Sequence, residues 1–255
     1  MKLTLNILFS KNSMRVFVAL VVWLSLCLSM VIVEAGEPVV SRLIVTDVTP
    51  VSFSVVYVAS EPCKGSIKVF DEKMRELTGL KVVSESQLHP PAEEYGLMQA
   101  KVEKLTPGTL YYLQTVTTSK SDGKVTIHPK EPIRVRTEKT ATPVNNPILA
   151  QRIYFKNQVP GDGSLFIVSL EGSSYPVSGW VGQYPNPPSP WALVDLNNLY
   201  CVKSHQNLEV RGGERVTIEV LGGVRGYVRY TGKVPHPSQG AIIELTPPIV
   251  LTTSQ

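Results

Sequence analysis

Short apolar runs of alternating character, punctuated by proline and glycine, limit the folds open to this chain. Beyond residue 35 no segment keeps a helical repeat for three turns, whereas apolar and polar residues alternate over many short runs. Such alternation is typical of β-strands that bury one face. The 18 glycines and 20 prolines follow no period, which fits turns between strands and excludes a collagen-like repeat. The sequence therefore predicts an all-β fold.

Alternating runs fill the chain from residue 38 to residue 137. The strands that they predict are Arg42–Asp47, Ser52–Tyr57, Ser66–Phe70, Leu97–Leu105, Leu110–Thr117 and Ile133–Thr137. Six or seven short strands in about 100 residues is the number expected of an immunoglobulin-like β-sandwich. We therefore expect residues 36–138 to form one such domain.

A polar segment with two prolines, residues 139–147, lacks any periodic pattern and is predicted to be a linker. A second β-rich segment, residues 148–255, follows it. Its predicted strands are Gln151–Lys156, Leu165–Leu170, Trp191–Asp195, Arg215–Leu221, Gly226–Tyr230 and Ala241–Leu245. We expect a second β-sandwich here, so that two immunoglobulin-like domains stand in tandem.

One turn in the first segment carries more information than the others. Leu105 precedes the turn residues Pro107 and Gly108, and Tyr111 begins the next alternating run. In immunoglobulin-like sandwiches a tyrosine near the start of the sixth strand folds back, and its hydroxyl bonds to backbone upstream. We therefore predict that Tyr111 fixes a corner where the chain crosses between two sheets.

These residues resemble the signature of the fibronectin type III family, and Tyr57 stands where that family usually has a tryptophan. Residues 58–70 are similar to the variant that precedes the catalytic domain of purple acid phosphatases and related metallophosphoesterases. The second segment loosely resembles carboxypeptidase-regulatory and other immunoglobulin-like accessory domains. The resemblance implies a fold, but no activity, because this architecture hosts many unrelated functions.

The first 35 residues are typical of an export signal. Basic residues precede an apolar run from Val16 to Val33, and small or aliphatic residues end it at Val33-Glu34-Ala35. We expect cleavage after residue 35 and a location outside the cytoplasm, either periplasmic, on the cell surface or secreted. The run also reaches the length of a membrane-spanning helix, so an uncleaved anchor formed by residues 16–33 is the alternative.

Without this segment the chain carries 22 basic and 20 acidic residues, which predicts no nucleic-acid partner. It then keeps two cysteines, Cys63 and Cys201, far apart in sequence. In an oxidising compartment they could form a disulfide between the two domains, but two buried free thiols fit equally well.

No pattern of catalytic or cofactor-binding residues is present. The four histidines do not stand in the settings that a two-metal phosphoesterase requires, so the catalytic domain suggested by the resemblance is absent. On an extended strand, Cys201 and His205 would be about 13 Å apart, too far to share a metal ion. We therefore expect a protein that is not an enzyme and has no metal or cofactor.

Two groups of residues are candidate binding surfaces. The first is a proline-rich loop whose aromatic residues, Trp180, Tyr184 and Trp191, could stack on a sugar or a partner protein. Alternatively, its tryptophans plug the ends of the sandwich. The second is a row that alternation places on one strand face, namely Arg225, Tyr227, Arg229, Thr231 and Lys233. It could meet an anionic partner, or it could form a ladder of charges with neighbouring glutamates.

The sequence thus favours an exported, non-catalytic binding or scaffold module whose partner is another envelope or extracellular protein. The alternative is a carbohydrate-binding module that uses the aromatic loop. In both hypotheses the protein would contact the membrane only through its N-terminal segment, and only if that segment is not cleaved.

Overall fold

The computed structural model describes residues 37–89, 92–140, 142, 144–182, 188–236, 242–245 and 247–252. These residues form strands, loops and single 3-10 turns of three or four residues, and the prediction of an all-β fold is confirmed. The expected export signal or anchor lies outside the described residues. Within them, no helix has the length and apolar character needed to cross a membrane.

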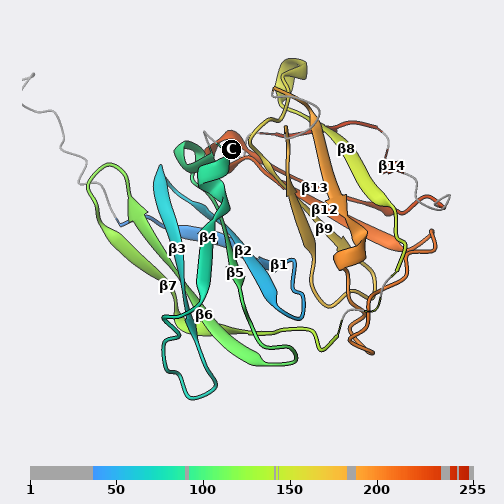
Figure 1. Cartoon of the computed structure of the whole chain (residues 1–255). Coiled ribbons are helices and arrows are strands. Elements are labelled where there is room, and N and C mark those ends of the chain that lie inside the picture. The colour runs from blue at the N-terminus through green and yellow to red at the C-terminus, as the bar shows by residue number, and fades with distance from the viewer. Residues whose placement is uncertain are drawn as a thin grey trace, which may run out of the picture. The chain divides into compact units, whose positions relative to one another are not determined.

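The N-terminal half of the described chain contains two antiparallel sheets, which we call the N-terminal sheet pair (Figure 1). A four-stranded sheet has the order β1-β2-β5-β4, and a three-stranded sheet has the order β3-β6-β7. Their bounds are β1 Val40–Thr46, β2 Ser52–Ala59, β3 Cys63–Phe70, β4 Lys81–Ser84, β5 Leu97–Glu103, β6 Leu110–Ser119 and β7 Val125–Arg136. Two 3-10 turns, η1 (Glu85–Leu88) and η2 (Ala92–Tyr95), connect β4 to β5.

The C-terminal half contains a second sheet pair, with one sheet of order β10-β9-β12-β13 and another of order β11-β8-β14. β15 also pairs with β8, and both β14 and β15 run parallel to it. Three 3-10 turns lie between these strands, namely η3 (Lys156–Gln158), η4 (Leu196–Asn198) and η5 (Gly223–Arg225). The strand bounds are β8 Ile148–Tyr154, β9 Leu165–Leu170, β10 Val177–Trp180, β11 Trp191–Asp195, β12 Arg215–Leu221, β13 Tyr227–Lys233, β14 Ile242–Glu244 and β15 Ile249–Val250.

Single bridges join the two C-terminal sheets on both sides. Val181 pairs with Ala192 beside β10 and β11, and Tyr227 of β13 pairs with Thr252 just after β15. The sequence predicts a β-sandwich here, and these bridges partly close the two sheets on each other. Closure reduces the length of unpaired strand edge.

Alternation explains most of these strands. β6 alternates between half-buried and buried residues along its whole length, as a strand with one buried face should. Each predicted strand is present within a few residues of its expected bounds, except that β7 begins at Val125, eight residues before the predicted start at Ile133. β4, β10 and β15 are not predicted, because runs of two to four residues are too short to show a period.

Leu105, Gly108 and Tyr111 form the corner that the sequence predicts in the N-terminal sheet pair. Leu105 is buried, and Gly108 has a φ of 66°, a left-handed conformation that glycine adopts without strain. The Tyr111 hydroxyl accepts a hydrogen bond of 2.9 Å from the backbone N–H of Thr106. This is the upstream contact that the sequence predicts for Tyr111.

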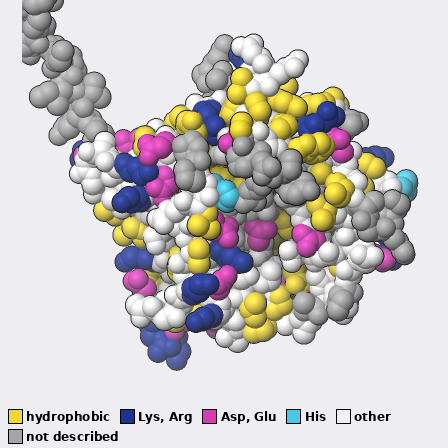
Figure 2. Space-filling model, turned by 45° about the horizontal axis from the view of Figure 1, so that its top comes forward, with side chains coloured by type: hydrophobic (Ala, Val, Ile, Leu, Met, Phe, Trp, Pro, Cys, Tyr) yellow, Lys and Arg dark blue, Asp and Glu magenta, His cyan; other side chains and the backbone are white. Residues whose placement is uncertain are grey.

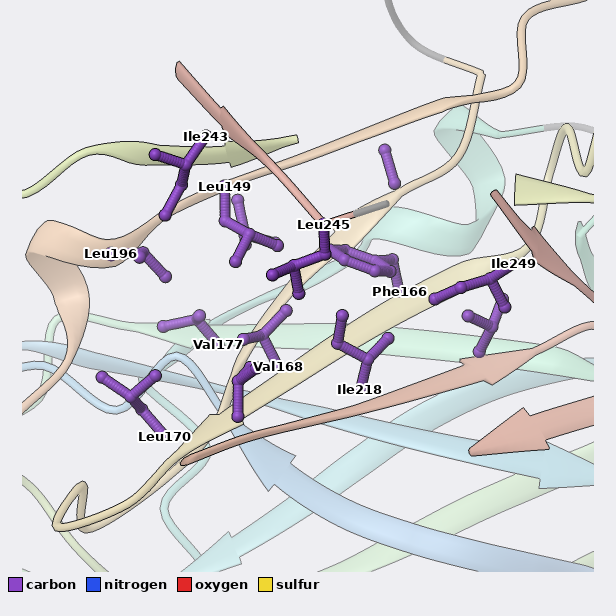
Figure 3. Close-up of a cluster of buried hydrophobic side chains, with 14 of the residues drawn as sticks. Leu149, Phe166, Val168, Leu170, Val177, Leu196, Ile218, Ile243, Leu245 and Ile249 are labelled. Carbon is purple, nitrogen blue, oxygen red and sulfur yellow. The ribbon is translucent and has the colours of Figure 1, made fainter. Parts of the chain in front are cut away.

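Each sheet pair encloses its own apolar core. In the N-terminal pair the fully buried Tyr57 lies among Phe53, Met98 and Leu113, and burial raises its pKa to about 12. Figure 3 shows the C-terminal core, where side chains from β8, β9, β12 and β14 point toward one another around Phe166. Burial of apolar surface in these two clusters is the main force that stabilises the fold.

A third apolar cluster joins the two sheet pairs. The outer face of β2 and β5 contributes Val56 and Leu97, and the outer face of β9 contributes Leu165 and Ile167. All four are almost completely inaccessible to solvent, although alternation places them on the face that an isolated sandwich would expose. The other buried members are Ala92, Trp180 and Leu221. We call this contact between the sheet pairs the seam.

The strands cross steeply at the seam. Arg42 of β1 lies over the ring of Tyr227 in β13, whereas Thr46 of β1 bonds to Ser178 in β10. β13 and β10 are the two edges of one four-stranded sheet, about 14 Å apart at the usual strand spacing. Four residues of β1 span about 13 Å, so β1 must run across that sheet rather than along it.

The described residues of the predicted linker lack regular structure, but they are bound to the C-terminal half. The Asn146 amide donates to the carbonyl oxygens of Leu196 and Leu208, and its side-chain oxygen accepts from the Val210 N–H. A buried amide with three hydrogen bonds fixes the chain at this point. The end of the segment is therefore part of the folded structure and does not act as a free tether.

Candidate functional site

Trp180 is not exposed, so the prediction that its ring forms part of a binding surface is wrong. It is 4% exposed in the seam and stacks on the His89 ring at 4.6 Å between centroids. Burial lowers the pKa of His89, which favours the neutral imidazole for this stacking. Trp180 is thus buried, but in the seam between the sheet pairs and not at an end of one sandwich, as the alternative would have it.

Arg225 also lies elsewhere than predicted. It belongs to the 3-10 turn η5 rather than to a strand face, and its guanidinium lies 3.7 Å from the Tyr95 ring centroid and 4.6 Å from that of Phe155. It donates to the backbone carbonyls of Gly222 and Asp162. Arg225 thus connects η2, from the N-terminal half, to loops of the C-terminal half, and is not available as a surface cation.

The remaining members of the predicted row are divided between the seam and solvent. The Tyr227 hydroxyl donates to Glu219 at 2.6 Å, and Arg42 lies 3.5 Å from its ring centroid. Tyr227 therefore packs against the seam, and its side chain is only half-exposed. Arg229, Thr231 and Lys233 are exposed, as the sequence predicts for that face.

Trp191 is the described aromatic of the proline-rich loop that keeps contact with solvent. It is half-exposed at the start of β11, and the Arg152 guanidinium lies 5.7 Å from its ring centroid. Arg152 in turn forms an ion pair of 2.6 Å with Glu244. Tyr184 lies outside the described residues.

A polar network borders the apolar part of the seam. Both carboxylate oxygens of Asp47 accept hydrogen bonds from Ser178, one from its backbone N–H at 2.9 Å and one from its hydroxyl. The Ser178 hydroxyl also contacts Thr46 at 3.1 Å and accepts from the Gln99 amide at 2.9 Å. Burial raises the pKa of Asp47 against these hydrogen bonds. We call these four residues the Asp47 network.

A second carboxylate, this one buried, connects the end of the N-terminal half to the other half. Glu138 is 1% exposed, and its two oxygens contact the Ser174 hydroxyl at 2.6 Å and His205 Nδ1 at 3.1 Å. Serine, histidine and glutamate together suggest a nucleophilic triad, but here both partners bind the carboxylate. A triad needs the histidine between the other two residues. The arrangement therefore holds two segments together rather than activating a hydroxyl.

Cys63 and Cys201 are free thiols, so the disulfide alternative is not formed. Cys63 is buried in the N-terminal core, while Cys201 is half-exposed and bridges to Ser173 in the C-terminal half. Burial raises the pKa of the Cys63 thiol to about 11. Cys201 and His205 do not lie on an extended strand, because the His205 N–H donates to the Cys201 carbonyl in a turn.

Within the described part of the chain, no group of three or more histidine, cysteine, aspartate or glutamate side chains could hold a metal ion. The structure instead brings together residues that the sequence did not single out: Asp47, Ser178 and Glu138 from three separate segments. No local pattern could have identified them, because each acts through a partner distant in sequence. No known protein-family model matches the sequence, and no curated protein matches it either.

Proposed function

We propose that this chain is an exported, non-catalytic scaffold and protein-binding module, built of a fibronectin type III-like domain and a second immunoglobulin-like domain. The observation that carries the proposal is the seam. Apolar side chains of both halves are buried in it, and two carboxylates, Asp47 and Glu138, bridge its two sides. A joint of this kind holds two sheet pairs in one orientation, which suits a module that presents surfaces from both.

The distribution of chemically versatile residues also supports a scaffold. Trp180, Arg225 and Tyr227 are used to join the two halves. The visible face in Figure 2 carries basic and acidic side chains interspersed, without a large field of one sign. Such a surface is typical of proteins that make specific contacts through edges and loops rather than by attracting polyanions.

The fibronectin type III-like assignment draws support from the corner at Tyr111 and from the buried Tyr57. The Tyr111 hydroxyl bonds back to Thr106 within the loop that leads into β6. Tyr57 is fully buried in the N-terminal core. Both are the positions on which the resemblance rests.

The carbohydrate-binding alternative is the weaker proposal. Its platform needs several exposed rings, and burial of Trp180 removes one of them. Among the described residues of that loop, Trp191 alone keeps a half-exposed ring. One ring beside the Arg152–Glu244 ion pair is a small surface for stacking on a sugar.

Cross-linking in intact cells, followed by affinity capture of the full chain and mass spectrometry, tests the proposal. We expect one protein in near-equal amount to the captured chain, with cross-links on surface residues of either half. A Trp191→Ala variant is the matched control and should capture the same protein. Recovery of glycan alone, lost in Trp191→Ala, would replace this function with carbohydrate binding, and recovery of neither would refute the scaffold.

Export is tested separately by cell fractionation and by the mass of the mature chain. We expect the protein outside the cytoplasm and starting near residue 36. A full-length chain in the membrane fraction would instead indicate the uncleaved anchor at residues 16–33. A full-length chain in the cytoplasm would refute export.

A further inference from the structure

β13 is the edge strand of its sheet, and its outer side is unpaired along most of its length in the described part of the chain. It pairs with β12 on one side, and on the other side its first residue, Tyr227, pairs with Thr252. Beyond Tyr227 no described strand covers that side. An uncovered edge presents backbone donors and acceptors to any strand that can approach.

The direction of the free backbone groups follows from two hydrogen bonds. The Val234 N–H points toward the β12 side, where it donates to Glu214 at 2.9 Å, and the Tyr227 N–H points outward to Thr252 at 3.2 Å. Because N–H and C=O directions alternate along a strand, the groups of Arg229, Thr231 and Lys233 also point outward. These three residues therefore offer the hydrogen bonds that a further strand would need.

The same three residues direct their side chains to solvent, on the face opposite the core. Arg229 and Lys233 have no ion-pair partner among the described residues, and the carboxylate next to Arg229, Glu219, is bound by the Tyr227 hydroxyl. Lys233 stands directly opposite another exposed cation, Arg215. Like charges in that position repel, so acidic side chains nearby would be favoured.

The opposite face of β13 has a different character. Val228 and Tyr230 are partly buried and pack against the C-terminal core from its edge. A strand added beside β13 would place alternate side chains over these two residues. Apolar side chains there would extend the core, because removing Val228 and Tyr230 from water is favourable.

We propose that the outer edge of β13 binds an extended segment of another protein in which acidic and apolar residues alternate. The segment adds a strand to the sheet through the backbone of Arg229, Thr231 and Lys233. Its acidic side chains lie beside Arg229, Lys233 and Arg215, and its apolar side chains cover Val228 and Tyr230. This inference rests on the proposed protein-binding function and names the site and the chemistry of the partner.

Two other occupants fit less well. A second copy of β13 would bring its own Arg229 and Lys233 against the same cations, which disfavours self-pairing. The segment between β13 and β14, residues 234–241, has no acidic residue to complement the edge. The alternative hypothesis is that the cations on this edge prevent any strand from pairing with it. In that case the alternating acidic peptide would not bind.

The probe is a fluorescent peptide of four Glu-Val repeats, titrated with the full chain and followed by fluorescence anisotropy. A peptide of Lys-Val repeats and a peptide with four glutamates followed by four valines serve as controls. We expect saturable binding of the alternating acidic peptide that weakens as salt is added, and binding at least about tenfold weaker for both controls. Equal binding of the block peptide would overturn strand addition, and absence of binding would overturn the site.

Variants separate charge from backbone pairing. Arg229→Glu with Lys233→Glu should weaken binding at least about tenfold by placing acids beside acids. Thr231→Pro should do the same by removing one outward N–H, while leaving every bond to β12. Arg134→Glu, on the exposed side of the edge strand β7, is the matched control and should bind as the unchanged protein does. If Thr231→Pro binds the acidic peptide as tightly as the unchanged protein does, the peptide is held by charge attraction alone. Strand addition would then be refuted.

Hydrogen exchange gives a readout that does not depend on a variant folding. The amide protons of Arg229, Thr231 and Lys233 should exchange rapidly in the free protein and slowly with the peptide bound, while those of Val228 and Tyr230 are protected throughout. If cell capture recovers a protein partner but the peptide leaves these three amides unprotected, the edge inference fails and the scaffold survives. If capture recovers no protein partner, the proposed function itself fails.

Discussion

At the scale of single residues, the hydroxyl of Tyr111 makes the sharpest prediction. Tyr111→Phe removes the acceptor for the Thr106 N–H and little else, because the ring stays buried. We expect a loss of about 1–2 kcal/mol in the free energy of unfolding, measured by urea denaturation. Tyr112→Phe is the control, since its hydroxyl has no hydrogen bond to another described residue. Equal effects of the two variants would contradict the corner contact.

The two cysteines differ in a way that chemical labelling can detect. Cys63 is buried in the N-terminal core with a pKa raised to about 11, whereas the Cys201 pKa is lowered, chiefly by the backbone N–H of Ser204. Iodoacetamide should therefore label Cys201 in the folded protein and reach Cys63 only after unfolding. Peptide mapping by mass spectrometry reads each site separately. A peptide pair linked through both cysteines would contradict the free thiols.

At the scale of elements, β2 is a strand whose two faces are both buried by the chain itself. Val55 points into the N-terminal core and Val56 points into the seam, and both have no exposed surface. We expect Val55→Ala and Val56→Ala to lower the free energy of unfolding by similar amounts, about 1–3 kcal/mol each. Denaturant titration measures both. A negligible effect of Val56→Ala would mean that the seam does not form in solution.

At the scale of the whole molecule, the Asp47 network makes the contact between the halves depend on pH. Because burial raises the pKa of Asp47, the folded protein favours its protonated form. Its contribution to stability is complete below the usual value of 3.8 and is lost as the pH rises through the raised pKa. We therefore expect the stability of the unchanged protein, relative to Asp47→Asn, to fall as the pH rises above 3.8.

Asp71→Asn is the matched control, because the pKa of this partly exposed carboxylate is shifted the other way. The backbone N–H and the side chain of Arg75 lower the pKa of Asp71. Its contribution is therefore present above the usual value and is lost as the pH falls through the lowered pKa. Urea unfolding at a series of pH values should give differences of opposite slope for the two variants. The same slope for both would refute the burial of Asp47.

Local physics determined much of this molecule from its sequence. Alternating residues placed the strands because a half-buried strand must repeat every second residue, and the Pro107-Gly108 turn located the corner at Tyr111. The β13 row was predicted for the same reason, and Arg229, Thr231 and Lys233 are indeed exposed. Each of these features is determined by residues that are adjacent in the sequence. The sequence pattern is therefore enough to predict them.

Tertiary structure alone decided the seam, and with it the roles of Trp180, Arg225 and Asp47. The alternation of apolar and polar residues predicts on which face of a strand a residue lies. It does not predict whether a second sheet covers that face. Trp180 is buried because β2 and β5 present Val56 and Leu97 to it from more than 80 residues away, and Asp47 matters because Ser178 meets it. Contacts of such long range carry no local pattern, so the surface that the sequence offered to a partner was in large part already occupied by the chain itself.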